Sequence, residues 1–117
     1  MNIRRFKLSK AEKEITEHLR QEGHDVRTQF HIKGVPYLYD MSLPVLNLII
    51  EYQGNYWHAN PRRYPPGTIL NIQNKGPTPV EDIWNRDRDK KEQAERNGYR
   101  VVCIWEDEFL DDGLQCG

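Results

Sequence analysis

The sequence predicts an α/β domain, built as a small mixed β-sheet flanked by helices. Three observations lead to this fold class. A helix-start signal lies near the amino terminus, three short apolar runs follow it, and a helical pattern over residues 80–97 precedes a last apolar run. The 117 residues suffice for one domain rather than two, so we expect one domain over residues 1–117.

The first helix is predicted from its two ends. Ser9 and Glu12 have the S-x-x-E spacing of a capping box, which begins a helix. Gly23 is expected to end it. The inner face is predicted to hold three apolar residues at helical spacing: Ala11, Ile15 and Leu19.

Three strands are expected next, at residues 26–32, 37–41 and 45–52. Pro44 and Gly54 bound the third strand, and its dense apolar content predicts a central position in the sheet.

The third strand ends in polar residues that the alternation of side chains puts on one face, Glu51 and Gln53. A buried carboxylate without a partner is costly. Two interpretations stay open: Glu51 lies at a rim in contact with water, or it belongs to a polar site at the end of the strand, where α/β sheets often bind ligands.

Residues 54–80 are rich in proline and glycine and are expected to form a long irregular excursion. The excursion carries basic and aromatic residues that suit contact with DNA, among them Arg62, Arg63 and Lys75. A disordered surface loop is the alternative interpretation.

A second helix is predicted over residues 80–97 and a final buried strand over residues 99–105. The helix is expected to turn four residues inward: Ile83, Trp84, Lys91 and Ala94. Its charged segment, residues 85–96, also fits a solvated helix face.

The net charge of −1 hides an uneven distribution. Residues 106–117 contain five acids and neither lysine nor arginine, and we expect them to form an acidic tail or linker. Residues 1–10 contain four cations and no acid: Arg4, Arg5, Lys7 and Lys10. This distribution allows local phosphate contact, although an ordinary mixed-charge surface explains it equally well.

Cysteine usage and hydropathy give weaker expectations. Cys103 lies in an apolar run and is expected to be a buried thiol, and with Cys116 it makes no disulfide framework. No stretch has the length and apolarity of a membrane span or of a signal peptide. We therefore expect a cytoplasmic protein.

Three separated residues suggest hydrolytic chemistry on phosphates. Asp40 ends the second expected strand, His58 follows two aromatic residues, and Asp87 lies in the charged helix. A carboxylate that accepts one ring proton of a histidine orients that ring for proton transfer. A cation held by Asp40 would neutralise phosphate charge, and magnesium is the hard, oxygen-binding candidate.

The order of these motifs resembles the very short patch repair (Vsr) endonucleases. It comprises Ala11-Glu12, Asp40, residues 49–58 (IIEYQGNYWH), residues 86–89 (RDRD) and residues 98–106 (GYRVVCIWE), and so covers residues 9 to 106. More closely, it resembles the phage and bacterial homing endonucleases with an E-D-x-H-D active site. This resemblance implies a restriction-endonuclease-like fold of the PD-(D/E)xK superfamily and a magnesium-dependent DNA endonuclease.

The resemblance also implies a set of catalytic residues: Glu12, Asp40, Gln53, His58 and Asp87. In this family pattern Asp40 binds Mg²⁺ together with the backbone carbonyl of Tyr52, and Glu12 arranges metal-bound water. His58 is the general base and Asp87 supports it. The implied partner is double-stranded DNA, cut by a monomeric domain that belongs to a longer protein with a separate DNA-reading module.

Alternatives remain at both the site and the function. Asp40, Glu51 and Gln53 also fit a D…E-x-K pattern with glutamine in place of lysine, in which Glu51 is a metal ligand and His58 is incidental. The repair enzymes have a histidine where this chain has Gln53, which weakens a role in mismatch repair by nicking. A non-catalytic nucleic-acid-binding module on the same scaffold is the other functional alternative.

Overall fold

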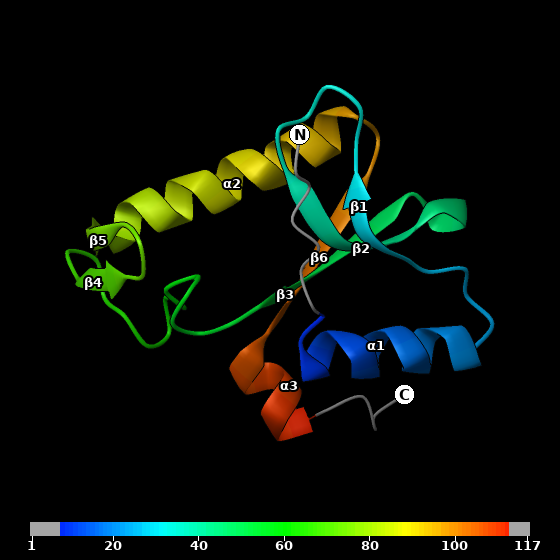
Figure 1. Ribbon diagram of the computed structural model, residues 1–117, viewed down its shortest axis with the longest axis horizontal. Coiled ribbons are helices and arrows are strands. Elements are labelled where there is room, and N and C mark those ends of the chain that lie inside the picture. Colours follow the sequence, from blue (N-terminus) through cyan, green and yellow to red (C-terminus); the bar gives the residue numbers. More distant parts are fainter. Residues whose placement is uncertain (1–7, 113–117) are drawn as a thin grey trace.

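The computed structural model describes residues 8–112, the side chains of residues 110–112 excepted. Figure 1 shows the elements in chain order: α1 (Lys10–Gln21), β1 (Arg27–His31), β2 (Leu38–Leu43), a 3₁₀ turn η1 (Pro44–Leu46), β3 (Leu48–Gln53), β4 (Ile69–Ile72), β5 (Gly76–Pro79), α2 (Val80–Arg96), β6 (Arg100–Trp105) and α3 (Glu106–Asp112). Three basic residues and one cysteine discussed above lie outside the described residues: Arg4, Arg5, Lys7 and Cys116.

Helix α1 begins at the predicted capping box. The Ser9 hydroxyl accepts the Glu12 backbone N–H at 3.1 Å, and the Glu12 carboxylate accepts the Ser9 backbone N–H at 2.9 Å. Each residue satisfies a backbone donor that the first helical turn leaves without a partner. Ile15, on the predicted inner face, is buried, and Leu19 packs against the same core cluster.

The main sheet has the strand order β1-β2-β3-β6, so β3 is central as predicted. β2 is antiparallel to both of its neighbours, whereas β3 and β6 are parallel, and the sheet is therefore mixed. In the register, Ile50 of β3 pairs with Met41 on one side and with Val102 on the other.

Helices cover both faces of this sheet (Figure 1). Ile50 packs with Ile15 on the face covered by α1 and α3. Ile49 packs with Ala94 on the face covered by α2. The alternation predicted for the third strand is thus confirmed at these positions, and it directs Glu51 and Gln53 toward the α2 face.

The third strand begins later than predicted, at Leu48 rather than Val45. Pro44 starts a 3₁₀ turn, and Asn47 ends that turn in a left-handed conformation with φ of 49°. Proline fixes its own φ and lacks a donor for the sheet, while asparagine tolerates the left-handed region. Pro44 and Asn47 therefore place Val45 in a turn rather than in the strand, and its apolar side chain is exposed.

The excursion over residues 54–80 is not wholly irregular, because β4 and β5 pair as an antiparallel hairpin. Asn74 and Gly76 have positive φ values of 71° and 74° and form its turn. Leu70, Val80 and Ala59 form a small core that joins the hairpin to the start of α2. The proline content of this segment led to the prediction of an irregular loop, whereas a small hydrophobic cluster stabilises a hairpin there.

Two further predictions need correction. Lys91 is exposed, and its neighbour Lys90 turns inward instead, whereas Ala94 is buried as predicted and Ile83 and Trp84 are partly buried. The expected acidic tail is helical over residues 106–112, because Phe109 packs into the core beside Tyr52 and fixes that segment. Residues 113–117 of that tail lie outside the described residues.

The last strand and its cysteine are less buried than predicted. β6 lies at the edge of the sheet, and Val102 is exposed, whereas Cys103 is half-buried. Burial raises the pKa of the Cys103 thiol, an effect that the nearby Glu51 carboxylate reinforces. Within residues 8–112, none of the helices has the length and apolar character that crossing a membrane requires.

Candidate active site

Asp40 and Glu51 meet where β2 and β3 separate, one step beyond the pair Met41–Ile50. The Asp40 backbone N–H donates to Glu51 Oε2 at 2.8 Å, and the Tyr52 backbone N–H donates to Asp40 Oδ2 at 2.8 Å. Each carboxylate therefore accepts a backbone donor from the opposite strand. The register brings together two acids that stand eleven positions apart in the sequence.

This arrangement strongly disfavours a negative charge on Asp40. Burial raises the pKa of Asp40 to about 8, with further raising contributions from the Glu51 and Glu12 carboxylates. The Tyr52 N–H and the Lys90 ammonium act in the opposite direction but do not offset the increase. Two close, buried carboxylates need either a proton or a cation between them.

Lys90 of α2 supplies a positive charge to Glu51. Lys90 Nζ lies 2.5 Å from Glu51 Oε1, and the two side chains are 14% and 6% exposed. The ammonium group also lies over the Tyr39 ring, 5.0 Å from its centroid, and the Tyr39 hydroxyl donates to the Lys90 carbonyl. Of the two interpretations of Glu51, contact with water at a rim is therefore wrong, because the carboxylate is buried and paired with Lys90.

The sequence interpretation missed Lys90. The D…E-x-K pattern has Gln53 where a lysine is expected, yet a lysine does reach Glu51, from a helix distant in the sequence. The available signal was spacing, because Lys90 follows Asp87 by one helical turn and so shares its face. The helical pattern of residues 80–97 predicted that the neighbouring Lys91 turns inward instead of Lys90.

Glu12 has two relationships at this end of the sheet. One carboxylate oxygen, Oε1, closes the capping box with Ser9. Its negative charge also adds to the raised pKa of Asp40, after burial and Glu51, and to that of the Tyr52 hydroxyl, after burial and Glu106. The first turn of α1 thus adds a third acid to the surroundings of Asp40.

His58 and Asp87 form the second cluster. His58 Nδ1 lies 2.9 Å from Asp87 Oδ2, and their side chains are 27% and 17% exposed. A single turn after β3 presents the histidine, since the His58 backbone N–H donates to the Gly54 carbonyl at 3.1 Å. The Trp84 indole N–H donates to the Ala59 carbonyl at 2.6 Å and attaches this turn to α2.

A small pocket of about 140 Å³ lies beside this pair, between α2 and the β4–β5 hairpin. Trp57 and His58 line it from the loop, Arg86 and Asp87 from α2, and Lys75 from the hairpin. Two cations, Lys75 and Arg86, and two acids, Asp82 and Asp87, therefore border the space next to the hydrogen-bonded histidine.

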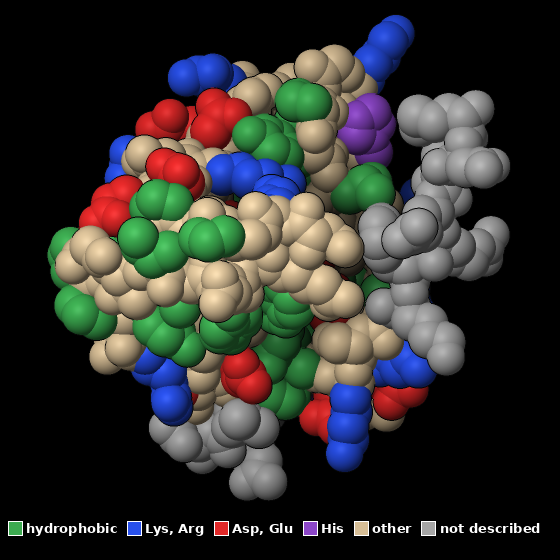
Figure 2. All heavy atoms as spheres, turned by 60° about the vertical axis from the view of Figure 1, so that its left-hand side comes forward, with side chains coloured by type: hydrophobic (Ala, Val, Ile, Leu, Met, Phe, Trp, Pro, Cys, Tyr) green, Lys and Arg blue, Asp and Glu red, His purple; other side chains and the backbone are tan. Residues whose placement is uncertain are grey.

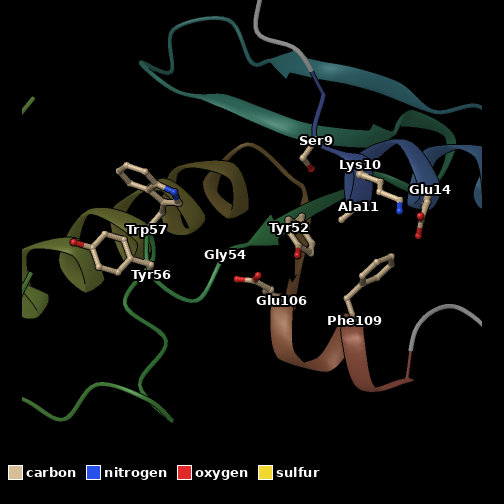
Figure 3. A pocket seen from close by; sticks show the side chains of 10 residues that line it. All are labelled: Ser9, Lys10, Ala11, Glu14, Tyr52, Gly54, Tyr56, Trp57, Glu106 and Phe109. Atoms are coloured by element: carbon tan, nitrogen blue, oxygen red, sulfur yellow. The ribbon is translucent and has the colours of Figure 1, made fainter. Parts of the chain in front are cut away.

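A larger cleft of about 630 Å³ opens on the other side of Trp57 (Figure 3). Tyr56 and Trp57 lie on one side of it, Tyr52 and Phe109 on the other, and Glu106 between them. Tyr52 thus contributes its ring to this cleft and its backbone N–H to Asp40. The cleft and the acidic cluster meet at the end of β3.

Gln53 is buried at the last position of β3, where it pairs with Trp105 of β6 in the parallel ladder. Within residues 8–112 its side chain hydrogen-bonds to neither Asp40 nor His58. The structure therefore brings Asp40 together with Tyr52 and Glu51, and His58 together with Asp87, but leaves Gln53 outside both clusters.

The donor set around Asp40 is small. Among the residues that the structure describes, no three histidine, cysteine, aspartate or glutamate side chains lie close enough to hold a metal ion. Mg²⁺ does not need such a cage, because it is commonly bound by one or two carboxylates and keeps several waters. Asp40 and the neighbouring Glu51 are carboxylates at this end of the sheet.

The chain matches no protein-family model and no curated protein sequence. Its fold is similar to a solved homing endonuclease, the I-Bth0305I catalytic domain. The TM-score is 0.56 at 23% sequence identity, over 89% of this chain and 83% of that domain. At this identity the likeness concerns the fold, and it supports the predicted α/β architecture.

Proposed function

We propose that this chain is the catalytic domain of a magnesium-dependent DNA endonuclease of the homing type, with an E-D-x-H-D active site on a Vsr-like variant of the PD-(D/E)xK fold. The observation that carries the proposal is the pairing of His58 with Asp87 at 2.9 Å. These residues stand 29 positions apart, and the same two were chosen from the motif order alone. The fold similarity to a homing endonuclease domain adds independent support.

In this proposal His58 is the general base. Asp87 accepts a hydrogen bond from the Nδ1–H group. Nε2 is therefore the ring atom that takes a proton from an attacking water. The water oxygen forms a bond to phosphorus, and the bond from phosphorus to the leaving sugar oxygen breaks. The leaving oxygen then takes a proton from solvent. Asp87 stabilises the imidazolium that forms and keeps the ring oriented.

Asp40 and the Tyr52 backbone carbonyl would hold Mg²⁺. In an extended strand the N–H and C=O of one residue point to the same side, so the Tyr52 carbonyl faces the side on which its N–H contacts Asp40. When bound, the ion supplies neutralisation of phosphate charge. Glu12, already near Asp40, would orient water beside it.

Asp40 is a better metal ligand than Glu51 because of how their oxygens are used. Both Glu51 oxygens have donors, Lys90 Nζ on one and the Asp40 backbone N–H on the other. Among the residues that the structure describes, Asp40 accepts a hydrogen bond at Oδ2, from Tyr52, and none at Oδ1. We therefore assign Glu51 to the support of Asp40 and leave the D…E-x-K assignment as the second choice.

The proposed substrate is double-stranded DNA, bound by a monomer in the cytoplasm of a bacterial or phage-infected cell. On the face shown in Figure 2, basic side chains are scattered among acidic and apolar ones, which suits local phosphate contacts more than a broad binding surface. Arg62 is already paired with Asp107 at 2.8 Å. Arg63, which is exposed, and Lys75, beside the histidine pocket, are better candidates for phosphate contact.

A separate DNA-reading module would then provide sequence specificity, in a protein longer than this chain. Non-specific phosphate binding typically has a dissociation constant of about 10⁻⁴–10⁻⁶ M at physiological salt. The test is to incubate the chain with random-sequence plasmid and Mg²⁺ and to map the new ends by sequencing. Weak, scattered cuts are expected. Cuts at a single long site would mean that these 117 residues already read sequence, and no Mg²⁺-dependent cuts would favour a non-catalytic binding module.

A further inference from the structure

The turn that carries His58 is attached to the acidic helix α3. The Asn55 backbone N–H donates to Glu106 Oε1 at 2.9 Å. The Asn60 side-chain amide donates to Asn55 Oδ1 at 2.9 Å and to Asp107 Oδ2 at 3.2 Å. Both ends of the turn around His58 are thus tied to the first residues of α3.

Asn60 is the centre of these contacts. It is completely buried, and its backbone N–H donates to the Asn55 carbonyl at 2.8 Å. The Asn60 side-chain oxygen accepts a hydrogen bond from the Arg62 backbone N–H at 3.0 Å. The Asn60 backbone carbonyl accepts one from the Arg63 backbone N–H at 2.8 Å. A buried amide whose donors and acceptors are used in this way specifies one local conformation.

The turn needs this support because its backbone is unfavourable. Ala59, between His58 and Asn60, has φ of 48°, in the left-handed region that residues other than glycine rarely adopt. Residues held in this region persist only where their surroundings over-determine them. Here those surroundings are the Asn60 contacts and the Trp84 hydrogen bond to the Ala59 carbonyl.

Asp107 is itself fixed on the far side of Asn60. Arg62 Nη2 donates to Asp107 Oδ1 at 2.8 Å and Arg62 Nε donates to Oδ2 at 3.3 Å. This bidentate contact lowers the pKa of Asp107 and keeps the carboxylate ionised.

We propose that Asn60 and Asp107 are positioning residues that set the location of His58 relative to Asp87. The proposal rests on the proposed function, since it assigns these residues to the support of the general base. The start of the acidic segment that was expected to be a tail or linker is then the element that holds the general base in position. A misplacement of about 1 Å at a catalytic group can reduce the rate by about 10²-fold.

The kinetic test uses Asp107→Asn, which keeps the side-chain shape and removes the charge. Glu95→Gln is the matched control, because it removes the same charge from an exposed acid of α2. Single-turnover cleavage should slow about tenfold in Asp107→Asn and remain unchanged in Glu95→Gln. In a His58→Ala background, Asp107→Asn should cause no further loss, because it acts through His58. Independent, multiplicative losses would overturn the proposal.

A spectroscopic test separates this proposal from the failure of the nuclease assignment. With ¹⁵N-labelled histidine, the His58 ring N–H held by Asp87 should be slow to exchange with water in the wild type. That signal should weaken or shift in Asp107→Asn and in Asn60→Ala, and not in Glu95→Gln. If the wild type cleaves no DNA, this readout still decides whether the turn is positioned. An unchanged ring signal in Asp107→Asn, together with a lowered melting temperature, would show a merely structural contact.

Discussion

His58 Nδ1 lies 2.9 Å from Asp87 Oδ2, so the turn after β3 and the middle of α2 meet in one hydrogen bond. Both side chains are partly exposed beside a small pocket with Lys75 and Arg86 in its wall. A histidine oriented by a carboxylate and accessible to a ligand has the geometry of a general base. The position of a bound phosphate in this pocket would decide from which water molecule His58 takes a proton.

The alanine variants of this pair test its role. His58→Ala and Asp87→Ala should each reduce the cleavage rate of a short DNA duplex by about 10²–10⁴-fold, the usual loss for a general base. The double variant should be little slower than the worse single variant, because the two act as a unit. Glu92→Ala, exposed on the same helix, is the control and should cleave normally. Multiplicative losses would show that the pair does not act together.

The pKa of Asp40, raised to about 8 against an ordinary value of 3.8, predicts a pH-dependent stability in EDTA. The folded protein keeps the Asp40 proton up to about pH 8, whereas the unfolded chain releases it near pH 4. This group therefore lowers the free energy of unfolding as pH rises through that range. Urea unfolding midpoints should fall from pH 5 to pH 9, and fall less in Asp40→Asn. An equal fall in both proteins would mean that Asp40 titrates normally.

The buried ion pair predicts a large and specific loss of stability. Lys90→Met leaves Glu51 buried without its cation, and breaking such a pair typically costs about 3–5 kcal/mol. Lys91→Met, at the next and exposed position, should change the free energy of unfolding by less than about 0.5 kcal/mol. Adding Glu51→Gln to Lys90→Met should restore part of the loss, because the unpaired charge is gone. Equal effects at the two lysines would place Lys90 in solvent.

Much of the fold could be predicted because local signals were strong. The Ser9–Glu12 capping box predicted the start of α1, and the apolar density of residues 45–52 predicted the central strand. The β4–β5 hairpin was missed because its prolines resemble loop composition, while its stability comes from contacts of Leu70 with Val80. Such a cluster depends on tertiary packing, which periodicity does not report.

The order of motifs along the chain predicted part of the candidate site. His58 and Asp87 could be paired from the resemblance, and their contact is present. The meeting of Asp40 with Glu51 required the strand register, which the sequence does not specify. Lys90 was missed because the helical pattern pointed to Lys91 as the inner residue, and Asp107 was missed because its acidic segment was expected to be a tail or linker.

Phosphate contacts are expected at Arg63 and Lys75 rather than at Arg62. The double variant Arg63→Ala/Lys75→Ala should weaken DNA binding at low salt. It should also reduce the slope of log affinity against log salt by about two, one for each lost phosphate contact. Lys33→Ala/Lys13→Ala, two exposed positions away from the pocket, is the control pair. An unchanged slope in the Arg63 and Lys75 variant would remove the excursion from the DNA-binding surface.

The most direct test of the central claim is relaxation of a supercoiled plasmid by wild type and by Asp40→Asn, in Mg²⁺ and in EDTA. Asp25→Asn is the matched control, since it neutralises an exposed aspartate that contacts Arg27. We predict nicking by wild type and Asp25→Asn in Mg²⁺ only, and none by Asp40→Asn although it remains folded. Nicking by Asp40→Asn at the wild-type rate, or by the wild type in EDTA, would contradict a magnesium-dependent endonuclease centred on Asp40.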